Sequence, residues 1–187
     1  ATDTVLNYGG QVGVARRGGD SGKVTVDDFA VLNPPPSLPV PTPTPSATQR
    51  SETFNNTTLH VLPSGWSEWS SDGTAGFGVS GEKPNGTGLG LVDNGSSAHA
   101  ARAWMTDSLS GDVQASASIF VSSLIPTQVF VRGSNLDSKT PTYYAASLTR
   151  GMELRLVEVV NGQATTLKTL KSSSYFSSVW ARVTLSA

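Results

Sequence analysis

The sequence predicts an all-β protein, an antiparallel β-sandwich or jelly roll, from three observations. Residues 112–121 alternate apolar and polar side chains with period two, as a half-buried strand does. Two further alternating runs, 152–160 and 163–170, flank Asn161-Gly162, a dipeptide that supplies the two positive φ angles of a type I′ hairpin turn. No stretch of about twelve residues has a helical period.

The other expected strands follow from the same alternation. Residues 11–16 and 23–32 form two strands, joined by a glycine-rich turn at 18–22. Residues 127–132 and 179–185 add two more. These segments place the expected strands within residues 11–32 and 112–185.

One aromatic-rich segment predicts a turn instead. Trp66-Ser-Glu-Trp-Ser70 follows Pro63-Ser-Gly65, and such a sequence occurs in disulfide-containing receptor and thrombospondin-type modules. This chain has no cysteine. We therefore expect a local turn of alternating apolar and polar residues, anchored by Trp66.

Composition excludes several function classes. The 187 residues include 13 Lys and Arg against 14 Asp and Glu, a net charge of −1, and the only adjacent basic pair is Arg16-Arg17. Nucleic-acid binders need clustered cations, so no nucleic-acid partner is expected. No apolar run approaches the roughly 18 to 20 residues that cross a bilayer, so no membrane insertion is expected either.

Cysteine and histidine counts narrow the chemistry further. Without cysteine there can be no disulfide framework, thiol catalysis or thiolate metal site, and two histidines make a zinc site improbable. No signal-type segment opens the chain, so it is either cytosolic or has lost its leader. Low charge with abundant Ser, Thr and Gly favours an exported protein, extracellular or at the cell surface.

A proline-rich stretch separates a short N-terminal part from the rest. Residues 34–46 hold seven of the eleven prolines and predict an extended polyproline II spacer, about 3.1 Å per residue. A loop inside one domain is the alternative. We therefore expect a linker over 34–49. Residues 1–33, before it, are too few to bury a core alone.

Short motifs along the chain carry a resemblance. They are ETF at 52–54, LPSGW at 62–66, ARAW at 101–104, VRG at 131–133, YYA at 143–145 and VWARVT at 179–184. Their order resembles laminin-G-like, concanavalin-A-like jelly-roll modules of bacterial repetitive surface proteins. The final two strands of such modules resemble residues 10–14 and 26–31, which come first here. The resemblance implies that 1–33 end one module and 50–187 begin the next, or that the chain is one circularly permuted domain.

This order has a consequence for assembly. A sandwich without its closing strands exposes sheet edges, which pair with whatever strand is available. If residues 1–33 complete a neighbouring copy, each chain gives two strands and receives two, a contact that propagates into a filament. The partner would then be the protein itself, bound through the apolar side chains Val24, Val26, Phe29 and Val31.

Calcium is the cofactor that the resemblance implies. Related jelly rolls place a structural ion near the positions of Asp27, Asp28 and Glu52, and calcium takes six to eight oxygen ligands. Neighbouring strand residues point to opposite faces, so only one of the two aspartates can share a face with Glu52. The resemblance favours Asp28 with Glu52; solvent-exposed strand-end carboxylates are the alternative.

Catalysis is not expected. A glycosidase needs two carboxylates about 5 to 10 Å apart, and the Glu-x-Asp-x-x-Glu motif of glucanases with this fold is absent. Glu153 and Glu158 are an odd number of residues apart, so on a regular strand they face opposite sides. The chain also lacks a Gly-x-Ser-x-Gly elbow.

Sugar binding is the main alternative chemistry. Trp180 and Arg132 alternate outward from their strands, and together with Tyr143 they could form a platform for a polysaccharide, although such rings also fill the core of a sandwich. We therefore expect a non-catalytic extracellular structural or adhesive repeat module that assembles into a surface fibre or array. A calcium-assisted carbohydrate-binding module is the alternative, and a glycoside-active enzyme is a distant third.

Overall fold

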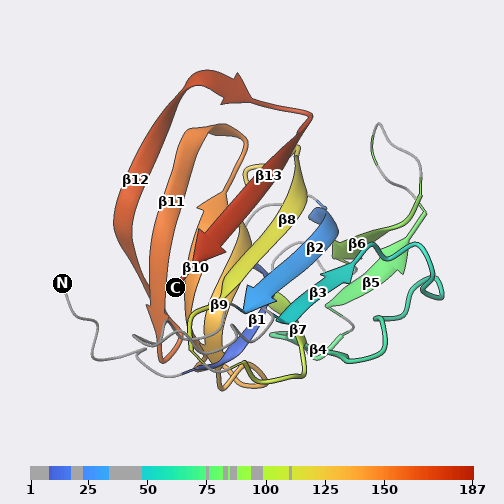
Figure 1. Cartoon of the computed structure of the whole chain (residues 1–187). Helices are drawn as coiled ribbons and strands as arrows, with labels where there is room; N and C mark the ends of the chain where they lie inside the picture. Colours follow the sequence, from blue (N-terminus) through green and yellow to red (C-terminus); the bar gives the residue numbers. More distant parts are fainter. Residues whose placement is uncertain are drawn as a thin grey trace, which may run out of the picture.

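The computed structural model describes residues 9–17, 23–33, 48–74, 76–81, 84, 88–93, 99–109 and 111–187. These residues form two antiparallel β-sheets that pack face to face as a sandwich, and none of them is helical (Figure 1). The predicted all-β class and the two-sheet sandwich are confirmed.

The larger sheet contains seven strands within the described residues. In spatial order they are β12 (Gln163–Phe176), β11 (Gly151–Val160), β10 (Thr142–Leu148), β9 (Thr127–Ser134), β1 (Gln11–Arg16), β7 (Ala101–Met105) and β4 (Trp66–Ser70). Strand β1 comes first in the chain but lies inside the sheet, between β9 and β7.

The smaller sheet has six strands in the same part of the chain. Its order is β13 (Val179–Ser186), β8 (Gln114–Val121), β2 (Thr25–Asn33), β6 (Gly90–Asp93) and β5 (Phe77–Ser80), and β3 (Thr48–Glu52) pairs with the second half of β2. Strand β2 is therefore also central, with β8 on one side and both β6 and β3 on the other.

The main core lies between the sheets and follows the predicted alternation. In β8 and just before it, Val113, Ala115, Ala117, Ile119 and Val121 are all buried in this core. Because their neighbours point outward, each sheet also has an outer face. On the seven-stranded sheet that outer face carries a second apolar cluster, which positions the candidate site.

The expected hairpin between β11 and β12 is confirmed. Asn161 and Gly162 have φ angles of 50° and 81°, the left-handed values that a type I′ turn requires. All seven expected strands are present, some of them longer than predicted; β12 reaches Phe176. The predicted turn at 18–22 lies outside the described residues.

Two predictions need correction. Trp66-Ser-Glu-Trp-Ser70 is not a turn but strand β4, at the edge of the larger sheet, with Trp66 in the main core. Its alternating side chains fit a strand because β7 supplies a partner, which no local signal reveals. The end of the predicted linker, residues 48–49, belongs to β3, while 34–47 lie outside the described residues.

Candidate functional site

The outer face of the seven-stranded sheet is partly covered by the chain itself. Its apolar cluster consists of Ala15, Trp104, Phe130, Leu136, Tyr143, Ala145, Val157 and Val159. Leu136, from the connection between β9 and β10, is only 2% exposed, so residues 135–141 fold over this face. We call residues 135–141 the cover loop.

Arg102 of β7 holds the cover loop in place. Its Nε donates to the carbonyl oxygen of Leu136 (3.0 Å), and its Nη2 donates to the carbonyl oxygen of Ser138. At the other end of the loop, the Gly162 amide in the β11–β12 turn donates to the Pro141 carbonyl (2.8 Å). The cover loop is thus held at one end by β7 and at the other by the β11–β12 turn.

Beside the cover loop lies a pocket of about 210 Å³. Its aromatic lining is Trp69 and Tyr143, and its basic lining is Arg16, Arg17, Arg102 and Lys139. The remaining lining residues are small or aliphatic: Ala100, Pro141, Val159, Gly162 and Ala164. The described lining includes no acidic residue, in a chain that carries one more acidic than basic residue overall.

Both aromatic rings are held by contacts with neighbouring side chains. The Arg102 guanidinium lies over the Trp69 ring, 4.0 Å from its centroid, so one face of the indole is covered and only the other face and its edge can meet a ligand. The Tyr143 hydroxyl donates to Gln128 Oε1 (3.1 Å), and its ring packs on Phe130 with centroids 4.9 Å apart. The rings are therefore preorganised.

Burial changes the titration of two pocket residues. Desolvation lowers the pKa of Arg102 from its ordinary value to about 10, against the opposing effects of Tyr143 and Asp137, so Arg102 stays cationic at neutral pH. Burial likewise raises the pKa of Tyr143 above 10.0, against the opposing charges of Arg102 and Arg17. The site at neutral pH thus combines neutral aromatic surface with positive charge.

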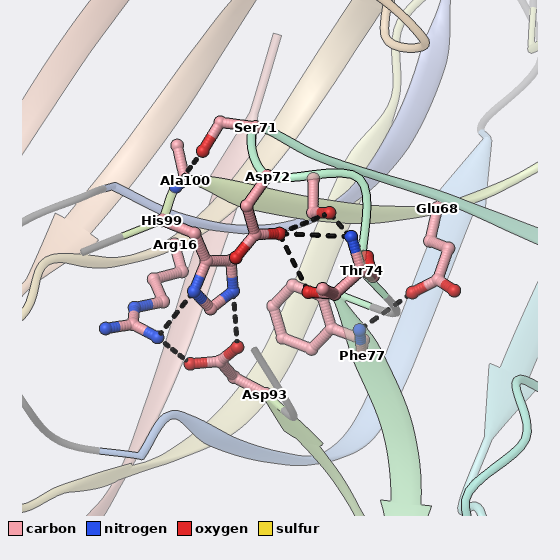
Figure 2. A network of polar contacts seen from close by, with 10 residues as sticks. Arg16, Glu68, Ser71, Asp72, Thr74, Phe77, Asp93, His99 and Ala100 are labelled. Carbon is pink, nitrogen blue, oxygen red and sulfur yellow. Dashed lines mark hydrogen bonds and ion pairs between the residues drawn. The ribbon is translucent and has the colours of Figure 1, made fainter. Parts of the chain in front are cut away.

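Arg16, one of the pocket-lining residues, also belongs to a buried polar network with Asp93 and His99 (Figure 2). Arg16 Nη1 pairs with Asp93 Oδ2, and His99 Nε2 lies 2.8 Å from Asp93 Oδ1. All three side chains are almost completely buried. Because Arg16 ends β1 and Asp93 ends β6, the network joins the two sheets, and the carboxylate of Asp93 balances the charge of Arg16.

A second link between the sheets lies beside this network. Glu68 Oε2 of β4 accepts a hydrogen bond from the Phe77 amide of β5 (2.7 Å), as Figure 2 shows. The neighbouring turn is closed by Asp72, whose Oδ1 accepts from the Thr74 amide (3.1 Å) and hydroxyl (2.7 Å). These contacts fix β4, and with it Trp69, against the smaller sheet.

The predicted platform residues are not brought together. Tyr143 lines the pocket, whereas Arg132 sits at a left-handed φ of 55° in β9, 3.6 Å from Asp112 Oδ1. Trp180 packs on Phe120, and its Nε1 donates to the Pro84 carbonyl (2.9 Å). Trp180 therefore lies on the outer face of the smaller sheet, on the opposite side of the sandwich from Tyr143.

The predicted calcium residues lie on neighbouring strands. Asp28 is exposed at an irregularity in β2 with a φ of 48°, and its carbonyl accepts from Arg182 Nη1 (2.9 Å). Glu52 of β3 pairs with Phe29, and its Oε1 accepts from the Phe54 amide (2.7 Å). In the part of the chain that the structure describes, no three His, Cys, Asp or Glu side chains gather as metal ligands do.

The predicted assembly residues are part of the core. Val24, Val26, Phe29 and Val31 are each at most 1% exposed and pack between the two sheets of the same chain. Phe29 also meets Trp66 edge-on, with centroids 5.1 Å apart.

Sequence reasoning missed most of the pocket. Trp69, Arg102 and Lys139 were not candidates, and Arg17 appeared only in the adjacent basic pair Arg16-Arg17. The available signal was the alternation in residues 101–105, which puts Arg102 and Trp104 on the face opposite Ala101 and Ala103. That signal places a cation on an outer face but does not reveal the loop above it.

The fold and the site define an all-β, antiparallel two-sheet sandwich with an aromatic and basic pocket on one outer face. Comparison with family models, curated proteins and solved structures finds no match to this chain. Among the described residues there is no helix long and apolar enough to cross a membrane.

Proposed function

We propose that this chain is a non-catalytic, extracellular adhesive module that binds a saccharide in the pocket between Trp69 and Tyr143. The observation that carries the proposal is the combination of two fixed aromatic rings with basic side chains in one hollow. Sugar rings present apolar C–H faces and hydroxyl groups, which such a combination complements. The resemblance to laminin-G-like jelly-roll modules supports the same setting.

Binding is preferred over hydrolysis because of the lining. Glycoside hydrolysis requires two carboxyl groups across the bond that is cut, and the described lining contributes cations, rings and small side chains. The arrangement can hold and orient a sugar, but it offers no pair of groups to protonate a leaving group and activate water.

The test is a binding titration with two matched tryptophan variants. We expect Trp69→Ala to abolish binding of soluble oligosaccharides, measured by calorimetry, and Trp180→Ala to leave it unchanged because Trp180 lies on the opposite face. Circular dichroism and thermal melting confirm that both variants fold. Binding that depends on Trp180 and not on Trp69 would overturn the pocket and favour the smaller sheet.

Self-assembly by strand exchange is a second candidate. It is favoured by the place of β1 and β2, which come from the N-terminal part of the chain yet are central in both sheets. A neighbouring copy could supply the same two strands. The assembly would be a surface fibre or array, with calcium at Asp28 and Glu52 as a proposed structural ion.

Measuring the size of the purified protein in solution distinguishes strand-exchanged polymers from compact monomers. Strand exchange predicts concentration-dependent polymers by light scattering and filaments by negative-stain imaging, and a role for calcium predicts their collapse in a chelator. Compact monomers at every concentration would rule out exchange and leave residues 9–33 completing their own sandwich.

A further inference from the structure

The charge of the pocket indicates the chemical class of its ligand. Four basic residues line it, with no acidic residue among the described lining, although the chain as a whole has a net charge of −1. Charged residues drawn at random from this sequence would include both acidic and basic side chains. Concentrated positive charge in a partly enclosed hollow attracts anions, because the low-dielectric walls reduce screening.

The four cations have different roles. The charge of Arg16 is balanced by Asp93. Arg102 is committed to the carbonyl oxygens of Leu136 and Ser138 and to the Trp69 ring, so it positions the site and contributes its field. Arg17 and Lys139 remain, and within the described part of the chain no carboxylate forms an ion pair with either.

Arg17 is the better placed of the two for direct contact. It follows β1, its amide is anchored to the Pro126 carbonyl (3.3 Å), and its side chain is exposed. Arg17 lines the same pocket as Tyr143. A guanidinium forms two parallel hydrogen bonds with a planar carboxylate, and it also binds sulfate through several donors.

Pocket size limits what carries the anion. A volume of about 210 Å³ lies below the roughly 300 to 1,000 Å³ of sites that enclose drug-sized ligands. The pocket therefore suits one ring or a terminal group of a longer chain.

We infer that the pocket binds an acidic sugar residue, its ring between Trp69 and Tyr143 and its carboxylate or sulfate on Arg17, with Lys139 as a second cation. This inference rests on the proposed saccharide binding. It adds that charge, and not ring shape alone, selects the ligand.

The experiment compares three oligosaccharides of equal length by calorimetry: one ending in glucuronate, one ending in glucose and one ending in glucose sulfate. We expect at least about tenfold tighter binding of an acidic sugar than of the neutral one, with affinity falling as salt rises. The ratio of glucuronate to sulfate affinity identifies the anionic group.

Two arginine variants locate the contact. Arg17→Ala should remove the preference for the acidic sugar and leave weak neutral binding unchanged, while Arg17→Lys should keep part of the preference. Arg150→Ala, at an exposed arginine outside the pocket, is the matched control and should bind like the original protein.

The possible outcomes distinguish selection of an acidic sugar from saccharide binding as such. Equal affinity for neutral and acidic sugars, lost in Trp69→Ala, would overturn the anionic selection and leave saccharide binding standing. A preference that survives Arg17→Ala would overturn the role of Arg17. No binding of any of the three sugars would overturn both.

Discussion

Asp93 is the residue on which the link between the two sheets depends most. It accepts from Arg16 of the larger sheet and contacts His99, and all three side chains are buried. Removing one partner of a buried ion pair leaves the other charge desolvated without its counter-charge, which costs about 3 to 5 kcal/mol. We expect Asp93→Ala to lower the free energy of unfolding by that amount, measured by urea denaturation.

The control for Asp93 is an exposed aspartate. Asp107 pairs with Arg50, and both side chains are about half exposed, at 48% and 46%. Exposed pairs contribute about 0 to 1 kcal/mol, so Asp107→Ala should change stability little. Equal losses in the two variants would contradict a structural role for the buried network.

The buried phenol of Tyr143 makes the free energy of unfolding change with pH in the alkaline range. Because burial raises the pKa of its phenol above 10.0, the folded state keeps a proton that the unfolded state loses. The phenol's contribution to stability is therefore complete below pH 10 and lost as the pH rises beyond it. Arg102, whose pKa is lowered to about 10, acts in the opposite sense, since stability gains when the folded state releases a proton first.

The variant that isolates Tyr143 is Tyr143→Phe. At about pH 8 it should be less stable by about 1 kcal/mol, because the hydrogen bond to Gln128 is lost. The difference in stability between the two proteins should narrow at about pH 10.5, where only the original protein loses the phenol's contribution. Arg102 is present in both proteins, so the difference reports mainly on Tyr143. A gap that stays constant or widens would contradict this assignment.

Gly13 marks the closest approach inside the larger sheet. A Cβ there would meet the Ala103 carbonyl oxygen and lie 2.8 Å from both Phe130 Cζ and the Trp104 Cα. Gly13→Ala should cost about 3 kcal/mol or more, since backbone must move. Gly81→Ala is the control, because its Cβ would make only an ordinary 3.6 Å contact with Leu89. Thermal unfolding of both variants checks the difference.

At the scale of elements, the β11–β12 hairpin supports the pocket as well as the sheet. Gly162 has a φ of 81°, its amide bonds to the cover loop at Pro141, and a Cβ would lie 2.7 Å from the Lys139 carbonyl oxygen. Gly162→Ala should therefore destabilise the protein and also weaken sugar binding, since it displaces the loop that carries Lys139.

A variant at Gly73 distinguishes the loss of stability from the loss of sugar binding. Its φ is 75°, but nothing lies within 4 Å of an added Cβ. Gly73→Ala should show only the cost of left-handed backbone, roughly 1 to 2 kcal/mol, with unchanged affinity for oligosaccharide by calorimetry. If both variants bind sugar equally well, the hairpin does not position the cover loop.

Element by element, the sequence predicted what alternation and turn chemistry specify. Strand β8 and the turn at Asn161-Gly162 were predicted because a two-residue period and a left-handed dipeptide are local signals. Strand β4 was missed because its partner β7 lies far along the chain.

The candidate site was the least predictable part, for a geometric reason. Alternation points Trp180 outward from its strand, but it predicts no direction for Tyr143, and a sandwich has two outer faces. Only the pairing order puts Tyr143 in the same pocket as Trp69 and Arg102 and puts Trp180 on the other sheet. The contribution of Lys139 depends on how the cover loop folds back, which its sequence does not encode locally.

At the scale of the whole molecule, β1 and β2 fill the centres of both sheets. Deleting residues 1–33 would expose facing edges of β7 and β9 and of β8 and β6, together with the core behind them. We expect the truncated chain to be unfolded or aggregated by circular dichroism and light scattering. A synthetic peptide of residues 1–33 should restore the sandwich, and a scrambled peptide should not.

The central place of β1 also sets the order in which the molecule can form. Gly13 pairs with both Trp104 and Phe130, so β1 must wait for strands that are made much later. Contacts this distant in sequence slow folding, because a long loop must close before any pairing stabilises it. During that wait the apolar face of β1 has no partner within its own chain, which makes synthesis the stage at which this protein most needs protection from its neighbours.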